Sequence, residues 1–199
     1  MRQGILHLFE RTLEWELNFL DKLQTIRHPI LDWIMIFFTK LGDVGMIWII
    51  TSIVLLFFKK YRMVGVTSLL ALIIGAILTD LILKGWIGRE RPFTHLDSER
   101  IKEILIIKKP SSLSFPSGHT TSSFASGIVL AYYFRKYRIP FILLASLIAF
   151  SRMYLYVHFP TDILAGLIVG TLAAGLSLLI GKRWLRPLID RLETRQSTS

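Results

Sequence analysis

Residues 63–92 read MVGVTSLLALIIGAILTDLILKGWIGRERP, an apolar run that ends in a cluster of charged residues. A helix needs roughly 20 residues, within a range of about 17–25, to cross the hydrocarbon of a bilayer, and Met63–Leu83 is long enough to do so. Asp80 is the only charged residue in that run, and the cations begin at Lys84. The stretch therefore predicts a membrane-spanning helix with a group of charged residues at one end.

Similar apolar stretches recur along the chain, and the shorter ones must tilt or include flanking residues to span. Pro29–Thr39 contains Asp32 and spans only if its helix extends back through Thr25 or Ile26. Counting that segment, we predict an all-α polytopic membrane protein, a six-transmembrane-helix bundle. The four remaining spans are Val44–Phe58, Thr121–Phe134, Ile139–Tyr156 and Ile163–Ile180.

The first 24 residues have a different pattern. Apolar residues recur every four positions from Ile5 to Leu17, and charged residues such as Glu10 and Glu14 break the apolar core that a signal peptide requires. We predict an amphipathic helix over residues 1–24 that lies in the membrane interface. A soluble helix packed on the body of the protein is the alternative.

Composition supports a single membrane-embedded domain over residues 1–199. Apolar residues make up 52% of the chain, and the charges are confined to short stretches between apolar runs. A net charge of +10 would suit nucleic acid, but the basic residues flank apolar segments. Anionic phospholipids are therefore the expected partners, with no nucleic acid and no obligatory protein partner. The chain has no cysteine, which excludes disulfides and thiolate metal sites.

The short loops predict the orientation. Lys59–Arg62 and Arg135–Arg138 each carry three cations and no acid, and Lys182 and Arg183 follow the last apolar stretch. The positive-inside rule assigns all three to the cytoplasm, with both termini. Residues 84–120 hold seven cations against four acids, but longer loops count for less. We predict that the charged clusters face the extracytoplasmic side of the cell membrane.

The first charged cluster spans residues 84–92. Lys84 follows the apolar helix, and Arg91 should lie in extended or turn structure because proline disfavours helix in the residue before it. Two cations there suit the spread charge of a phosphate. The alternative is that both reach for lipid headgroups. Asp80 lies one helical turn before Lys84 and could pair with it.

The second cluster spans residues 116–119. Ser117 is a good helix N-cap and Gly118 allows close backbone approach, so the amides that begin the next helix predict an anion site. His119 is placed to donate a proton to a leaving oxygen. A capping or interfacial histidine is the alternative for a lone Pro-Ser-Gly-His.

The third cluster spans residues 151–162. Arg152 closes one helix, His158 lies in the connection, and Pro160 begins the next helix. Asp162 falls in the first turn, within reach of His158. A carboxylate bonded to one imidazole nitrogen leaves the other as a nucleophile. The alternative for Asp162 is that it only helps the helix to begin.

Together the clusters resemble the three signatures of the type-2 phosphatidic acid phosphatase family, with no departure at the signature positions: Lys84-x6-Arg91-Pro92, Pro116-Ser117-Gly118-His119 and Ser151-Arg152-x5-His158-x3-Asp162. The helix plan resembles the bacterial membrane branch, which includes phosphatidylglycerophosphate phosphatases. The apolar helices argue against the soluble vanadium haloperoxidases that share this pocket.

The resemblance implies a role for each signature residue. His158 would attack phosphorus, Asp162 would orient it, and His119 would protonate the departing lipid alcohol and then activate water. Family members need no metal, so no metal or other cofactor is expected. The phosphate oxygens would be held by Lys84, Arg91, Arg152, Ser117 and the Gly118 amide.

The resulting hypothesis is a metal-independent lipid phosphate phosphatase that works through a phosphohistidine. Phosphatidylglycerophosphate, converted to phosphatidylglycerol, is the first substrate choice, and undecaprenyl pyrophosphate in cell-wall carrier recycling is the alternative. A non-catalytic lipid-phosphate binder or flippase is the competing function of another class. Binding alone needs only the cations, so the added histidines and carboxylate favour the enzyme. Arg89, Glu90 and His95 are left outside the core site.

Overall fold

The computed structural model describes residues 2–185, and the regular structure among them is entirely helical. This confirms the all-α class for that part of the chain. Met1 and residues 186–199, including the predicted C-terminal end, lie outside the described residues. The helices are α1 (Arg2–Gln24), α2 (Pro29–Leu41), α3 (Met46–Leu56), α4 (Arg62–Ala76), α5 (Lys84–Ile87), α6 (Ser98–Ile104), α7 (Gly118–Tyr133), α8 (Arg138–Tyr154) and α9 (Pro160–Ile180).

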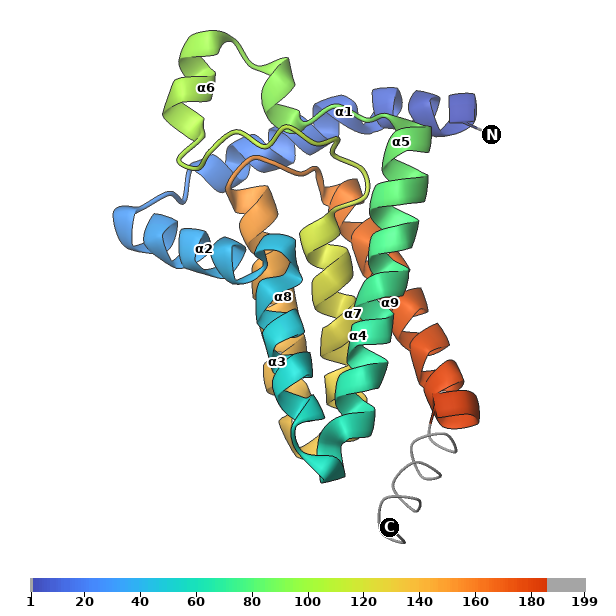
Figure 1. The fold of residues 1–199 in the computed structure, drawn as a ribbon. Coiled ribbons are helices and arrows are strands. Elements are labelled where there is room, and N and C mark those ends of the chain that lie inside the picture. Colours follow the sequence, from blue (N-terminus) through green and yellow to red (C-terminus); the bar gives the residue numbers. More distant parts are fainter. Residues whose placement is uncertain (1, 186–199) are drawn as a thin grey trace, which may run out of the picture.

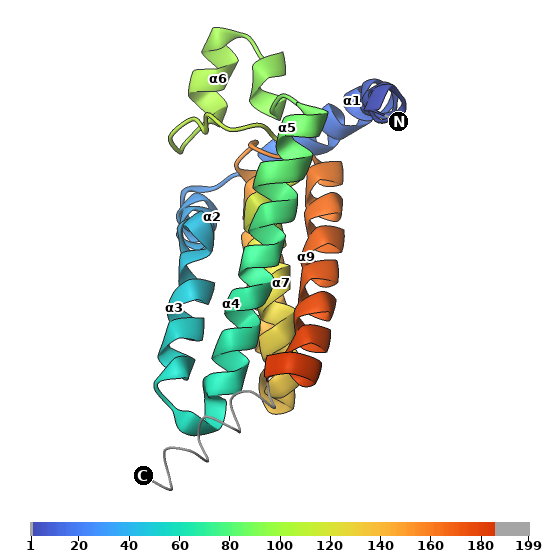
Figure 2. The same ribbon diagram turned by 45° about the vertical axis from the view of Figure 1, so that its right-hand side comes forward.

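Five of these helices, α3, α4, α7, α8 and α9, form an elongated bundle (Figure 1). Helix α7 packs against each of the other four and lies at the centre. Helices α1, α2 and α6 gather at one end, where α1 lies across the bundle, as the turned view in Figure 2 also shows. The bundle leaves apolar side chains exposed along α9, Leu164, Ile168, Leu172 and Leu179 among them, as expected of a surface that faces lipid.

The predicted span Met63–Leu83 is helical throughout. Helix α4 passes into a π-helical segment, Ile77–Leu83, and then into α5. The stretch Lys59–His95, which contains these helices, is a candidate membrane span by length and composition, and Pro160–Arg183 is a second. Both contain spans expected from the sequence.

Helices α2 and α3 form a bent pair. Their axes differ by 46° across the break near Gly42, and together they make a third candidate span if counted as one. The chain turns there because Val44 and Gly45 have positive φ angles of 53° and 70°, outside the helical region. Two segments that we expected to span separately are thus arms of one bent unit. The count of six spans stays a prediction.

Helix α1 covers Arg2–Gln24, in the segment where we expect an interfacial helix, and it packs on the body of the protein. Phe9, Glu16 and Leu20 are its buried residues. Leu8 and Trp15 remain 54% and 58% exposed, on a helix that lies across the bundle end. This packing agrees with the alternative raised from the sequence, while the exposed apolar residues suit an interface. Placement in the membrane interface stays a prediction.

The structure separates the basic turns from the charged clusters. The α3–α4 turn with Lys59 and Lys60 and the α7–α8 turn with Arg135 and Lys136 lie at one end of the bundle, and α5 lies at the other (Figure 1). The predicted orientation requires the basic turns and the charged clusters to lie at opposite ends of the bundle. Which end faces the cytoplasm stays a prediction.

Glycines on α9 let α7 approach closely. A Cβ built at Gly170 would lie 2.6 Å from the Thr121 carbonyl oxygen, and one at Gly166 would lie 2.8 Å from the Ser117 carbonyl oxygen. Such distances are not tolerated without a shift of the backbone, since both obstacles are main-chain atoms. The contact of α7 with α9 therefore depends on these small residues.

We expect Gly170→Ala to destabilise the protein by about 1–3 kcal/mol, because the added methyl group forces α7 and α9 apart. Gly175→Ala is the matched control on the same helix, since a Cβ there meets no atom within 4 Å. The control should keep or raise the melting temperature in detergent, as alanine favours helix over glycine. Equal melting temperatures for the two variants would contradict this account of the packing.

Candidate active site

The three charged clusters meet at the end of the bundle around a cavity of about 1210 Å³. Most of the predicted site residues line it. Ser117 and Asp162 are fully buried and are not among the lining residues that the structure describes. The predicted residues on the wall are Lys84, Arg91, Gly118, His119, Arg152 and His158.

His158 lies in the buried connection between α8 and α9. Its backbone N–H and that of Val157 donate to the carbonyl oxygen of Arg152, at 3.3 and 3.1 Å. The same connection belongs to a hydrophobic cluster that includes Leu20 of α1 and Phe93. Packing on both sides fixes where the imidazole can point.

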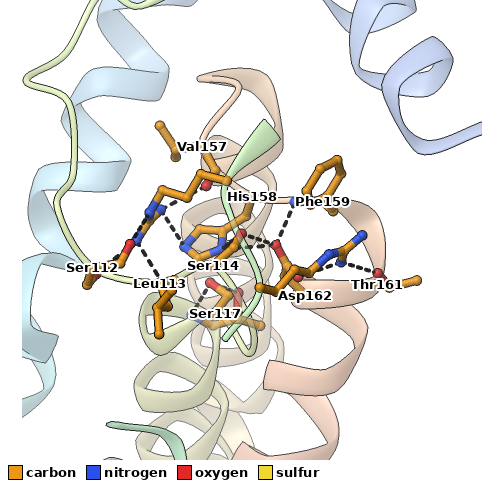
Figure 3. Close-up of polar contacts among 12 residues, drawn as sticks. Ser112, Leu113, Ser114, Ser117, Val157, His158, Phe159, Thr161 and Asp162 are labelled. Atoms are coloured by element: carbon orange, nitrogen blue, oxygen red, sulfur yellow. Dashed lines mark hydrogen bonds and ion pairs between the residues drawn. The ribbon is translucent and has the colours of Figure 1, made fainter. Parts of the chain in front are cut away.

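The contacts of the His158 ring define its tautomer. Nε2 lies 3.2 Å from Nη1 of Arg91, and Nδ1 lies 3.4 Å from Oδ2 of Asp162 (Figure 3). A guanidinium can only donate, so Nε2 accepts and the ring proton is on Nδ1, facing the carboxylate. The predicted pairing of His158 with Asp162 is thus present, and Nε2 keeps its lone pair on the cavity side of the ring.

Asp162 is held by more groups than His158. Oδ1 accepts from Nη1 of Arg89 at 2.7 Å, and Oδ2 accepts from the backbone N–H of Phe159 at 2.8 Å and from the hydroxyl of Ser114. Figure 3 shows these contacts converging on the carboxylate. Asp162 also lies in the first turn of α9, as expected, and Pro160 begins that helix. Both readings of Asp162 therefore apply, because it partners the imidazole and caps the helix.

Arg91 and Arg152 bring two guanidinium groups to the cavity wall. Arg91 has extended backbone beyond the end of α5, as predicted, and its Nη1 donates to the Val157 carbonyl oxygen at 2.8 Å. Its Nε donates to the carbonyl oxygen of Ser112 at 2.6 Å. Arg152 donates from Nη1 to Thr39, while its buried Nε has no hydrogen-bond partner among the residues described. That orphaned donor fits an anion in the cavity.

Lys84 approaches the same region from the end of the long helix. Its Nζ donates to Oδ1 of Asp80 at 2.6 Å, which confirms the expected i, i+4 pair. A Cβ built at Gly118 would lie 3.6 Å from that Nζ, so the first residue of α7 is close to the ammonium group. Gly118 leaves room for this approach.

His119 faces a carboxylate that the sequence reasoning did not assign. Its Nε2 lies 2.9 Å from Oδ1 of Asp43, which stands at the break between α2 and α3. Both residues line the cavity. Burial lowers the pKa of His119, and the hydrogen bond with Asp43 opposes this shift and orients the ring.

Ser117 has the predicted capping role. Its hydroxyl accepts from the Thr120 N–H at 3.4 Å and from the Thr120 hydroxyl at 3.0 Å. Its own N–H donates to the Asp162 carbonyl oxygen at 3.1 Å, which ties α7 to α9. The structure thus gives Ser117 a helix-capping position behind the cavity wall, and its phosphate contact stays a prediction.

Three further residues belong to the site. Arg89, which lies outside the core site expected from the sequence, and Ser114 both bond Asp162, and Asp43 bonds His119. In the sequence, the only local sign that Arg89 belongs to the site is its position two residues before Arg91. Within residues 2–185 no three His, Asp or Glu side chains are grouped to hold a metal ion.

Burial and the neighbouring cations lower the pKa of His158 well below its ordinary value of about 6.5. Burial is the largest cause, followed by the charges of Arg91 and Arg152. The neutral imidazole is the favoured form, because an added proton would meet low dielectric and like charges. A neutral ring with an unprotonated Nε2 is the form that can attack phosphorus.

The cations on the cavity wall suit a phosphate group, and the two histidines suit its transfer. The apolar surface of the protein suits a bilayer, so the fold and the site together define a membrane phosphatase. A model of the PAP2 superfamily matches residues 65–186, more than half of the chain. The chain belongs to the PAP2 superfamily and is one of its lipid phosphatases.

Two curated relatives support this placement. The chain is 31% identical over 151 residues to the undecaprenyl-diphosphatase of Sulfolobus acidocaldarius, covering 75% of this chain and 70% of the relative. It is 34% identical over 161 residues to phosphatidylglycerophosphatase B of Bacillus subtilis, covering 74% and 73%.

A solved structure has the same fold. The crystal structure of a transmembrane PAP2-type phosphatidylglycerolphosphate phosphatase from Bacillus subtilis superposes with a TM-score of 0.69 at 26% identity, covering 87% of this chain and 88% of that one. The membrane-protein class therefore rests on a homologous structure as well as on the apolar helices.

The position of His158 leads to a pH prediction. Activity is lost as pH falls through the pKa of His158 in the folded protein, so the acid limb of kcat/KM should lie below pH 6.5. In Arg91→Gln the limb should move to higher pH, because one of the charges that lower this pKa is gone.

The measurement is the pH dependence of phosphate release in detergent. Arg100→Gln is the control, since Arg100 lies on α6 and pairs with Asp21 instead. An acid limb that stays in place in Arg91→Gln would contradict the assignment of the limb to His158.

Proposed function

We propose that the protein removes the terminal phosphate of a membrane lipid through a phosphohistidine on His158. The observation that carries this proposal is the unprotonated Nε2 of a neutral His158, which has Asp162 on its other nitrogen and lies beside Arg91 on the wall of a cavity that Lys84 and Arg152 also line. A site that only bound phosphate would need the cations but would not need the oriented imidazole.

In the first step Nε2 of His158 attacks phosphorus, a P–N bond forms, and the bond from phosphorus to the lipid oxygen breaks. His119 gives its proton to that oxygen as the lipid leaves. As positive charge develops on the attacking ring, the carboxylate of Asp162 stabilises it through Nδ1.

In the second step water attacks phosphorus, and His119 takes a proton from it. The P–N bond breaks and inorganic phosphate leaves with His158 restored. Lys84, Arg91 and Arg152 act in both steps by stabilising charge on the phosphate oxygens. The Gly118 amide at the start of α7 adds a donor with the helix dipole behind it.

Phosphatidylglycerophosphate is our first choice of substrate. The 34% identity to phosphatidylglycerophosphatase B of Bacillus subtilis, together with the fold shared with a phosphatase of that name, supports it. Undecaprenyl pyrophosphate is the second candidate, supported by the 31% identity to the undecaprenyl-diphosphatase of Sulfolobus acidocaldarius. With that substrate the leaving group is a lipid phosphate in place of an alcohol.

The site is proposed to face the extracytoplasmic side of the cytoplasmic membrane. The basic turns at Lys59–Arg62 and Arg135–Arg138 support this, because they lie at the opposite end of the bundle from α5, whose Lys84 lines the cavity. Anionic phospholipids would contact those turns on the cytoplasmic side.

The test is phosphate release from these lipids by purified protein in EDTA. We expect release by the wild type and a loss of roughly 10⁴-fold or more in His158→Ala, since the nucleophile is removed. His7→Ala is the control, because His7 is exposed on α1. Full activity in His158→Ala would disprove the phosphohistidine route.

The binder or flippase gives a different result in the same assay. It would bind lipid phosphates tightly, and neither the wild type nor the variants would release phosphate. That outcome would replace the proposed function.

A further inference from the structure

We propose that the cavity contains a second anion site, formed by Lys40, Lys108 and Lys109, and that it binds a second phosphate group of the lipid headgroup. This inference rests on the proposed function and names the substrate class: lipids in which another phosphate anion lies close to the one that is cleaved. The three lysines line the same cavity as the catalytic residues.

The lysines stand on two walls of the cavity. Lys40 is in the last turn of α2, next to Thr39, which accepts a hydrogen bond from Arg152. Lys108 and Lys109 precede Ser112, whose carbonyl and hydroxyl oxygens accept from Arg91 at 2.6 and 3.0 Å. Each wall is therefore tied to a guanidinium of the proposed phosphate site.

The charge on the cavity wall exceeds what one phosphate needs. Lys84, Arg91 and Arg152 already supply three cations for the phosphate that is cleaved. The carboxylates on the wall are Asp43 and Asp80, and these are paired with His119 and Lys84. Three more ammonium groups with no carboxylate at ion-pair distance in the described part of the chain favour a second anion.

The described residues offer the three lysines no ion pair. Lys109 has its Nζ 5.0 Å from the ring centroid of Phe93, a cation–π distance that holds it near the wall. Lys40, Lys108 and Lys109 are all exposed, and all three line the cavity. All three are free to receive phosphate oxygens.

The cavity also has room for more than one phosphate. Its volume of about 1210 Å³ is larger than the roughly 300–1,000 Å³ usual for small-molecule sites. A lipid diphosphate carries its second anion on the adjacent phosphorus, and a glycerophosphate headgroup carries it on a phosphodiester. Phosphatidic acid has no second phosphate. The lysines would recognise the second phosphate group, which the lipid diphosphate and the glycerophosphate headgroup have in common.

The experiment compares three lipids in neutral detergent micelles, where no anionic bilayer is present. The substrates are phosphatidic acid, phosphatidylglycerophosphate and undecaprenyl pyrophosphate. For Lys40→Gln/Lys108→Gln/Lys109→Gln we expect kcat/KM for one or both two-phosphate lipids, relative to that for phosphatidic acid, to fall about tenfold. The lipid whose ratio falls identifies the source of the second anion.

Lys59→Gln/Lys60→Gln is the control, with charge removed at the other end of the bundle. A triple variant that keeps the wild-type ratios, or loses them no more than this control, would overturn the second anion site. Failure of the wild type to release phosphate from all three lipids would instead overturn the proposed function.

A different observation carries a second inference: Glu16 of α1 acts as a positioning residue for the nucleophile, through Arg89. Glu16 is fully buried, and its Oε2 accepts from Nη2 of Arg89. Nη1 of the same guanidinium donates to Oδ1 of Asp162 at 2.7 Å. One guanidinium thus joins the N-terminal helix to the carboxylate behind His158.

Both ends of this connection are fixed. The guanidinium of Arg89 lies between the rings of Phe9 and Phe159, 4.0 and 3.9 Å from their centroids. Oε1 of Glu16 accepts from the N–H and the hydroxyl of Thr161 at 3.0 and 2.6 Å, in the first turn of α9. Loss of the Glu16 charge would leave Arg89 less tightly held and Asp162 less well oriented.

For Glu16→Gln we expect kcat to fall about tenfold while KM stays within about twofold, because the phosphate-binding cations are untouched. Glu14→Gln is the control, since Glu14 is exposed on the same helix. Melting temperatures are measured beside the kinetics. Unchanged kcat in a folded Glu16→Gln variant, or a rise in KM alone, would overturn the positioning role.

Arg89→Lys and Arg89→Gln provide a second readout. Lysine keeps the charge beside Asp162 but cannot make the forked contact to both carboxylates, so it should restore part of the kcat lost in Arg89→Gln. Equal kcat in the two variants would show that the charge of residue 89 has no part in positioning.

Discussion

The carboxylate of Asp162 is the group on which the rest of the site depends. A fully buried charge is costly unless it is paired and hydrogen-bonded, and Asp162 meets this requirement with donors from three segments of the chain. Arg89 comes from beyond α5, Ser114 from the segment before α7, and the Phe159 amide from the start of α9. These three segments must meet at one place, because each supplies a hydrogen-bond donor to the same carboxylate. That requirement fixes His158 as well, because its Nδ1 faces the same oxygen.

The close packing of α7 on α9 connects the site to the body of the protein. Gly166 and Gly170 let the two helices approach until the Ser117 N–H reaches the Asp162 carbonyl oxygen at 3.1 Å. The start of α7, with Gly118 and His119, is thereby held against the helix that carries Asp162. A site built on rigid helices needs little rearrangement when charge develops, which suits stabilisation of a phosphate transition state.

Local features of the site could be predicted from the sequence because they depend on neighbours along the chain. The pair of Lys84 with Asp80, the cap at Ser117 and the start of α9 at Pro160 involve residues at most four positions apart. The pairing of His119 with Asp43 joins residues 76 positions apart. No spacing or propensity rule reaches that far, so only the folded chain shows it.

The fold likewise has features that follow from local sequence and features that depend on contacts between distant residues. The long apolar runs determine the helices, because each run must satisfy its backbone hydrogen bonds internally in a bilayer. The bend between α2 and α3 brings Asp43 to His119, and it depends on how Gly42 packs against Ile148 and His119, where an added Cβ would lie 2.5 and 2.9 Å from their side chains. Such steric limits arise only between elements already in contact.

The helical class, the three charged clusters and the chemical types that they supply follow from residue type and order alone. The groups that complete the clusters are seen only in the folded chain: Asp43 beside His119, Arg89 beside Asp162, and Glu16 beside Arg89. The physical reason is that residue type and spacing specify what a side chain can do. Which partner neutralises a buried charge depends on distances that only the folded chain establishes.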